Sequence, residues 1–100
     1  MALSGKVALI VGGVKNLGAQ SALELAGVGA NLALHYHSRS GKDDTTALEA
    51  ALKQKSPSIK VSFYQGDLTT APAVTKLFQE VVRDFGHVDI VVNTAGKVLK

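Results

Sequence analysis

VALIVGGVKNLGA, residues 7–19, is the stretch that decides the fold. From Lys6 to Val11 the chain is almost entirely apolar, which predicts a strand buried on both faces of a parallel sheet. Gly12 and Gly13 interrupt this run, and from Asn16 apolar residues recur at helical spacing. Because a helix amino end presents unpaired N–H groups and a partial positive charge, the turn is a candidate site for a phosphate or pyrophosphate.

The rest of the chain repeats the alternation of strand and helix. Further strands are expected at 31–36, 59–65 and 87–92, and further helices at about 43–55 and after Thr69 or Thr70. Gly29 and Gly86 are expected to stop the first and third helices, and Gly27 predicts a weak or crowded last turn in the first. The pattern predicts one α/β domain, a doubly wound parallel sheet with helices on both faces.

Composition excludes several classes of protein. The chain has 46% hydrophobic and 19% charged residues, as a globular protein does, and without cysteine it holds no disulfide or thiolate metal site. His35, His37 and His87 lack the spacing of a zinc site. The net charge of +3 is scattered, which favours a solvated surface over a nucleic-acid face. Neither a signal peptide nor a membrane span is predicted, so we expect a cytoplasmic protein.

Four polar or glycine-bearing segments are predicted at the carboxyl ends of the strands. In open parallel sheets, ligands bind beyond these ends, where the strand order reverses. The four segments therefore surround one crevice: residues 12–18, 36–39, 67–68 and 93–96.

The same segments resemble the short-chain dehydrogenase/reductase family. The resemblance rests on a strand followed by Gly12-x-x-x-Asn16-x-Gly18, on Asp67 after the third strand, and on Asn93-Thr-Ala-Gly96 after the fourth. It covers essentially all 100 residues and corresponds to the cofactor-binding amino-terminal half of a single-domain reductase with a Rossmann-type fold. The sequence departs from the family pattern at Val11, where threonine is usual, at Asn16, which replaces a glycine, and at Thr94, which replaces an asparagine.

The resemblance implies a role for each strand end. Gly12 and Gly18 would allow close approach of a pyrophosphate to the turn, which includes Asn16 and the backbone of Leu17. Asp67 would accept from the adenine amino group beside the Leu68 backbone. The ribose and the nicotinamide side would be lined by Asn93, Ala95 and Gly96. The plainer alternatives are that Gly12 only marks a strand-to-helix turn and that Asp67 only caps the next helix.

Charge favours NADP(H) over NAD(H). An NAD site uses an acid near the end of the second strand, yet no Asp or Glu occurs between Glu24 and Asp43. A 2′-phosphate needs cations and hydroxyl donors there. The candidates are Lys15 in the turn and His37, Ser38 and Arg39 after the strand, with Tyr36 at the strand's end. Alternatively, Arg39 is a solvated loop residue.

In the family, catalysis rests on a Ser, a Tyr and a Lys four residues beyond the Tyr, all in the second half of the domain. Tyr36 and Tyr64 are followed at that offset by Ser40 and Leu68, so no catalytic residue is assigned within the chain. The resemblance implies that the catalytic groups lie beyond Lys100, the last residue of the sequence. We expect the chain to be a fragment, or the ordered part, of a longer reductase and to be inactive alone.

For the intact protein the resemblance implies NADPH-dependent reduction of a small-molecule carbonyl to an alcohol, or the reverse, in a homotetramer or homodimer. The alternatives are an enoyl-thioester or imine reductase, a non-catalytic dinucleotide-binding or sensor module, and a structural fragment without a ligand.

Overall fold

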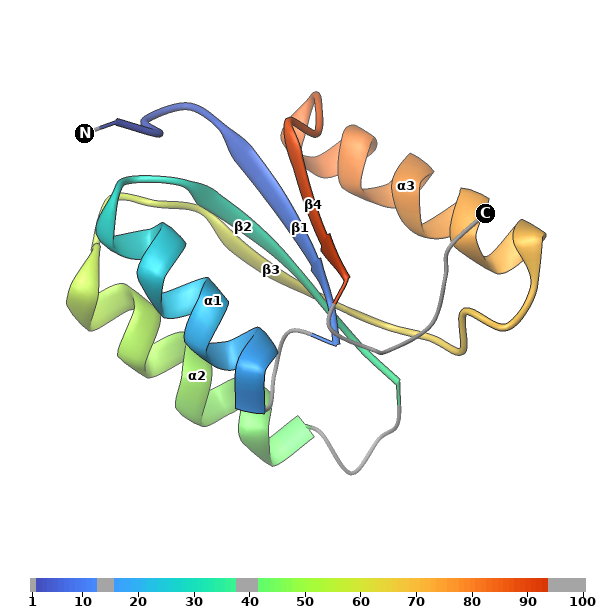
Figure 1. Ribbon diagram of the computed structural model, residues 1–100, viewed down its shortest axis with the longest axis horizontal. Helices are drawn as coiled ribbons and strands as arrows, with labels where there is room; N and C mark the ends of the chain where they lie inside the picture. The colour runs from blue at the N-terminus through green and yellow to red at the C-terminus, as the bar shows by residue number, and fades with distance from the viewer. Residues whose placement is uncertain (1, 13–15, 38–41, 94–100) are drawn as a thin grey trace.

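The computed structural model describes residues 2–12, 16–37 and 42–93 (Figure 1). Within these residues, strands and helices alternate along the chain, and all the strand pairs are parallel. The elements are β1 (Val7–Val11), α1 (Asn16–Gly27), β2 (Asn31–Tyr36), α2 (Lys42–Lys55), β3 (Val61–Gln65), α3 (Ala71–Phe85) and β4 (Ile90–Asn93). The strand order β3-β2-β1-β4 confirms the doubly wound sheet expected from the sequence.

Helices cover both faces of the sheet, α1 and α2 on one and α3 on the other (Figure 1). Side chains of β1 alternate between these layers: Ala8 and Ile10 pack in the cluster that contains α1 and α2 residues, whereas Val7 and Leu9 pack with α3. Every residue of β1 is at most 1% exposed. This two-sided burial explains why the strand is an unbroken apolar run.

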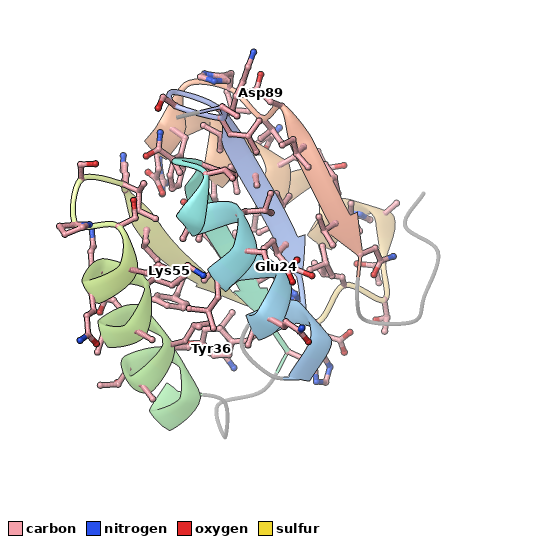
Figure 2. All side chains as sticks on the ribbon, turned by 60° about the vertical axis from the view of Figure 1, so that its left-hand side comes forward. Glu24, Tyr36, Lys55 and Asp89 are labelled. Carbon is pink, nitrogen blue, oxygen red and sulfur yellow. The ribbon has the colours of Figure 1, made fainter. Side chains whose placement is uncertain are left out.

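The strand order reverses beside β1, because β2 and β4 flank it on opposite sides. In the register of the sheet, Val11 pairs with His35 of β2 and with Asn93 of β4. The carboxyl ends of these three strands therefore lie level with one another. Figure 2 labels Tyr36, the last residue of β2 at the carboxyl ends of the strands, and Asp89, which precedes β4 at their amino ends. The switch point and the polar strand ends thus share one edge.

Two strands begin later than their residue patterns indicate. β3 begins at Val61 rather than Ile59, which is buried in the preceding turn, where its N–H donates to the Ser56 carbonyl over 3.3 Å. β4 begins at Ile90 rather than His87. The Asp89 carboxylate there accepts the Val7 N–H at 2.8 Å, and the Asp89 N–H donates to the Val7 carbonyl at 2.9 Å, so one residue satisfies both backbone groups at the start of β1.

The helix ends follow the expected signals. Thr70 caps α3 by accepting the Ala73 N–H at 3.3 Å, and Gly86 ends the same helix with a φ of 90°. α1 ends at Gly27, and Gly29 follows with a φ of 91°. A Cβ on Gly27 would lie 3.0 Å from Cε of Lys55, whose side chain extends from α2 toward α1 (Figure 2), so the last turn is crowded as predicted.

Candidate functional site

The carboxyl edge of the sheet gathers the strand-end residues that the sequence singled out. Gly12 follows β1, His37 follows β2, Asp67 and Leu68 follow β3 after Gly66, and Asn93 is the last residue of β4. α1 starts at Asn16 and Leu17, has no acid in its first turn, and buries Gly18 there. The helix amino end therefore keeps its partial positive charge at this edge.

Some of the residues named from the sequence lie outside the described part of the chain. They include Lys15, Ser38, Arg39, Ala95, Gly96 and Lys100. The roles given to the first five in cofactor binding stay predictions. The same holds for the expectation that the catalytic groups follow Lys100, because the described residues end at Asn93.

Gly12 adopts a conformation that favours glycine. Its φ is 74°, in the left-handed region where a side chain crowds the backbone. The chain thereby leaves β1 sharply, before α1 begins at Asn16. Local backbone geometry thus accounts for a glycine at position 12.

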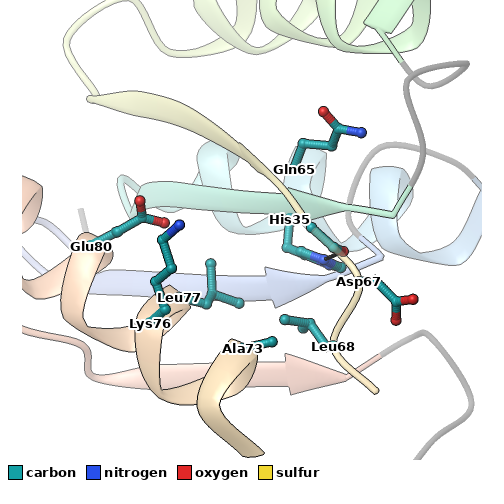
Figure 3. A pocket seen from close by; sticks show the side chains of 9 residues that line it. His35, Gln65, Asp67, Leu68, Ala73, Lys76, Leu77 and Glu80 are labelled. Atoms are coloured by element: carbon teal, nitrogen blue, oxygen red, sulfur yellow. Dashed lines mark hydrogen bonds between the residues drawn. The ribbon is translucent and has the colours of Figure 1, made fainter. Parts of the chain in front are cut away.

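His35 belongs to this edge, although sequence reasoning assigned it no role. The imidazole is 3% exposed and lies on β2 between the ends of β1 and β3. Nδ1 accepts the Gly12 N–H at 3.4 Å, and Nε2 donates to the Gly66 carbonyl at 2.7 Å (Figure 3). A histidine at the last buried position of an otherwise apolar strand was the signal in the sequence.

Asp67 shapes the loop after β3 but does not cap α3, because Thr70 does. Its Oδ1 accepts the Thr69 N–H at 3.1 Å, which closes a short side-chain turn. Hydrogen bonding by Thr69, with a smaller contribution from the His37 charge, lowers the pKa of the Asp67 carboxyl below its ordinary 3.8. The side chain remains 58% exposed, so the ionised carboxylate is available to a further donor.

A pocket of about 220 Å³ opens beside Asp67, between the end of β3 and α3 (Figure 3). Leu68, Ala73 and Leu77 contribute its apolar lining, and His35 closes it on the side of β2. Lys76 and Glu80 stand on α3 at its other wall. The pocket therefore adjoins the carboxyl edge on the α3 side of the sheet.

Tyr64 serves the packing of α3. Its hydroxyl donates to Oδ2 of Asp84 at 2.7 Å, which ties β3 to the end of that helix. Burial and this hydrogen bond raise the pKa of Tyr64 above its ordinary 10.0. A tyrosine that gives up a proton during catalysis needs the opposite shift. The contact gives Tyr64 a role in packing β3 against α3.

Among the described side chains of residues 2–12, 16–37 and 42–93, no cluster of three or more His, Cys, Asp or Glu could hold a metal ion. None of the helices in these ranges is long and apolar enough to cross a membrane.

Known proteins are similar to this chain in sequence. The hydroxynaphthalene reductase of Aspergillus fumigatus is 44% identical over 95 residues, which cover 94% of this chain and 33% of the relative. An NADP-dependent mannitol dehydrogenase of Alternaria alternata is 35% identical over 97 residues, or 95% of this chain and 35% of the relative. The chain therefore spans about a third of the length of these curated relatives.

Solved structures agree with the fold. A protein from Burkholderia cenocepacia described as a dehydrogenase, with bound NADP, superposes with a TM-score of 0.85 at 42% identity, covering 92% of this chain and 34% of that one. An NAD⁺-bound xylitol dehydrogenase gives a TM-score of 0.78 at 33% identity, covering 91% and 33%. Residues 6–99 match the family described as short chain dehydrogenase. The chain belongs to the short-chain dehydrogenase family of oxidoreductases.

Proposed function

We propose that the carboxyl edge of the sheet binds NADP(H), and that residues 1–100 are the cofactor-binding half-domain of a reductase. The intact enzyme transfers a hydride between the nicotinamide and a small-molecule carbonyl or alcohol. The observation that carries the choice of cofactor is the end of β2, where His37 lies and no acid occurs between Glu24 and Asp43. The relative described as NADP-dependent and the neighbour solved with NADP support it, whereas the xylitol dehydrogenase binds NAD⁺.

Each strand end has a role in this proposal. The pyrophosphate lies against the turn and the start of α1, near Gly12, Asn16, Leu17 and Gly18, where backbone N–H groups and the helix dipole favour an anion. Asp67 and the Leu68 backbone take the adenine, and Asn93, Ala95 and Gly96 take the nicotinamide ribose side. The 2′-phosphate is held after β2 and by the turn, through Lys15, His37, Ser38 and Arg39, beside Tyr36.

The cofactor supplies the hydride, and these residues supply its placement. The proposal assigns the Ser, Tyr and Lys of the family to a segment that follows Lys100 in the intact protein, and it places the protein in the cytoplasm as a homodimer or homotetramer. The hundred residues alone then bind at most the cofactor.

Fluorescence titration of the intact protein with NADPH and NADH tests the cofactor. We expect NADPH to bind at least about tenfold more tightly, since a hydrogen-bonded charge pair contributes about 1.5–3 kcal/mol. Equal affinities, or tighter binding of NADH, would overturn the proposal. Tight NADPH binding in a protein whose later sequence lacks Ser and Tyr-x-x-x-Lys would instead favour the non-catalytic binding module.

A further inference from the structure

His35 is a buried polar side chain on a strand whose other buried residues, 32–34, are aliphatic. Its position on β2 places it on the α3 face of the sheet, the face that Ala33 also uses. It pairs with Val11 of β1 and with Tyr64 of β3 in the sheet register. A histidine buried here costs desolvation energy, so both ring nitrogens need partners.

The two partners fix the state of the ring. The Gly12 N–H only donates, so Nδ1 must present a lone pair; the Gly66 carbonyl only accepts, so Nε2 must carry the proton. His35 is therefore the neutral Nε2–H tautomer. A second proton on Nδ1 would face the Gly12 N–H, donor against donor.

The ring joins two segments that are far apart in sequence. Gly12 opens the turn before α1, and Gly66 precedes Asp67 at the end of β3. Gly66 is held twice, because its N–H also donates to the Tyr36 carbonyl at 3.0 Å. The imidazole thus links the turn directly to the segment that leads into Asp67.

We infer that His35 is a positioning residue, which as a neutral ring holds the Gly12 turn and the Gly66–Asp67 segment at the separation that the dinucleotide requires. The inference rests on the proposed function, which assigns these segments to the pyrophosphate and to the adenine. In this role His35 acts through the two backbone positions that it bridges.

Protonation of His35 removes this link. Burial lowers the pKa of His35 below its ordinary 6.5, with a small contribution in the same direction from His37, although the Gly66 bond opposes the shift. Among the described residues, the charged groups around the ring are His37 on β2, Asp67 after β3, and Lys76 and Glu80 on α3. Because the folded protein favours the neutral ring, we expect the cofactor affinity of the site to decrease as the pH falls below 6.5 and through the lowered pKa of His35.

The test uses the intact protein and NADP⁺, which withstands acid, in calorimetric titrations from about pH 8 downward. His35→Gln retains one donor and one acceptor but does not titrate, and His35→Leu retains neither. His87→Gln is the matched control, since His87 bonds to the Gly5 carbonyl, before β1. At about pH 8 we expect H35Q to bind within about threefold of wild type and H35L about tenfold more weakly. H87Q should match wild type.

The pH profile separates positioning from general support of the fold. The 2′-phosphate titrates near pH ~6 in every variant, so the ratio of wild-type to H35Q affinity removes its contribution. We expect this ratio to fall with pH, and amide exchange at Gly12 to be faster in H35L and in acidified wild type than in H35Q.

Each contrary result has its own meaning. A constant ratio together with unchanged Gly12 exchange in H35L would overturn the positioning role alone. Absence of NADP⁺ binding by the wild type at about pH 8 would overturn the proposed function, and the role of His35 in the site with it.

Discussion

Nε2 of His37 lies 3.7 Å from Oδ1 of Asp67, so side chains that follow the neighbouring strands β2 and β3 meet at the carboxyl edge. Both are largely exposed, at 69% and 58% of their side-chain surface, and their attraction is therefore weak. In the proposed site Asp67 binds the adenine amino group and His37 binds the 2′-phosphate, at two ends of one adenosine. Their separate substitution distinguishes recognition of the adenine from recognition of the phosphate.

Substitution of Asp67 by Asn should weaken the binding of NADPH and of NADH equally. Oδ1 of the new amide can still accept from Thr69 N–H, whereas its NH₂ group faces the adenine amino group, donor against donor. We expect a loss of about tenfold for NADPH and for NADH alike, measured by fluorescence titration. A loss confined to NADPH, or no loss, would contradict the assignment of Asp67 to the adenine.

Substitution of Lys15 or Arg39 by Ala should affect NADPH selectively. The 2′-phosphate is the group that NADH lacks, so each change should lower NADPH affinity about tenfold and leave NADH nearly unchanged. Arg83→Ala is the matched control, because Arg83 pairs with Asp84 near the end of α3. Parallel losses for the two cofactors would show that these side chains support the pyrophosphate or the fold instead.

Gly27→Ala and Gly29→Ala should change stability in opposite directions. Ala is favoured over Gly in helices by about 1 kcal/mol, and the Lys55 side-chain end that a Cβ on Gly27 would meet at 3.0 Å can move away. Gly29 has a φ of 91°, a conformation that favours Gly over Ala, so its substitution should lower the free energy of unfolding by about 1–2 kcal/mol. Urea unfolding of the intact protein measures both, and the same sign for the two variants would refute the argument.

Tyr64→Phe should lower stability without changing cofactor affinity. The substitution removes the hydrogen bond to Asp84, which we expect to cost about 1 kcal/mol in urea unfolding. NADPH titration should match wild type, because the hydroxyl is directed to α3 and not to the cofactor edge. A change in affinity larger than about threefold would mean that the β3–α3 contact shapes the site.

Periodicity and glycine positions predicted the order of elements, since burial on two faces leaves a clear apolar run in β1 and helical spacing elsewhere. Helix ends were predicted less well. Apolar residues continue to Val28, but α1 ends at Gly27. Val28 therefore no longer follows the helical rotation and is 38% exposed, whereas Ala26 is fully buried.

The strand starts and the role of His35 depend on contacts between distant residues, which local patterns do not reveal. Asp89 ends the turn before β4 by accepting from Val7, far along the chain. His35 likewise takes its partners from the ends of two other strands. Composition showed that the end of β2 is basic, but it could not show that the preceding histidine joins the flanking strand ends.

The pairing of β1 with β4 has a consequence for the order of folding. β1, α1, β2, α2 and β3 follow one another along both the chain and the sheet, so they associate through short loops. The Val7–Asp89 contact instead spans 82 positions. β1 can therefore pair with its second neighbour, β4, only after the chain has passed through α3. Among the described elements, the crevice at the switch point is therefore completed last. A ligand bound there stabilises only chains in which β4 has joined β1.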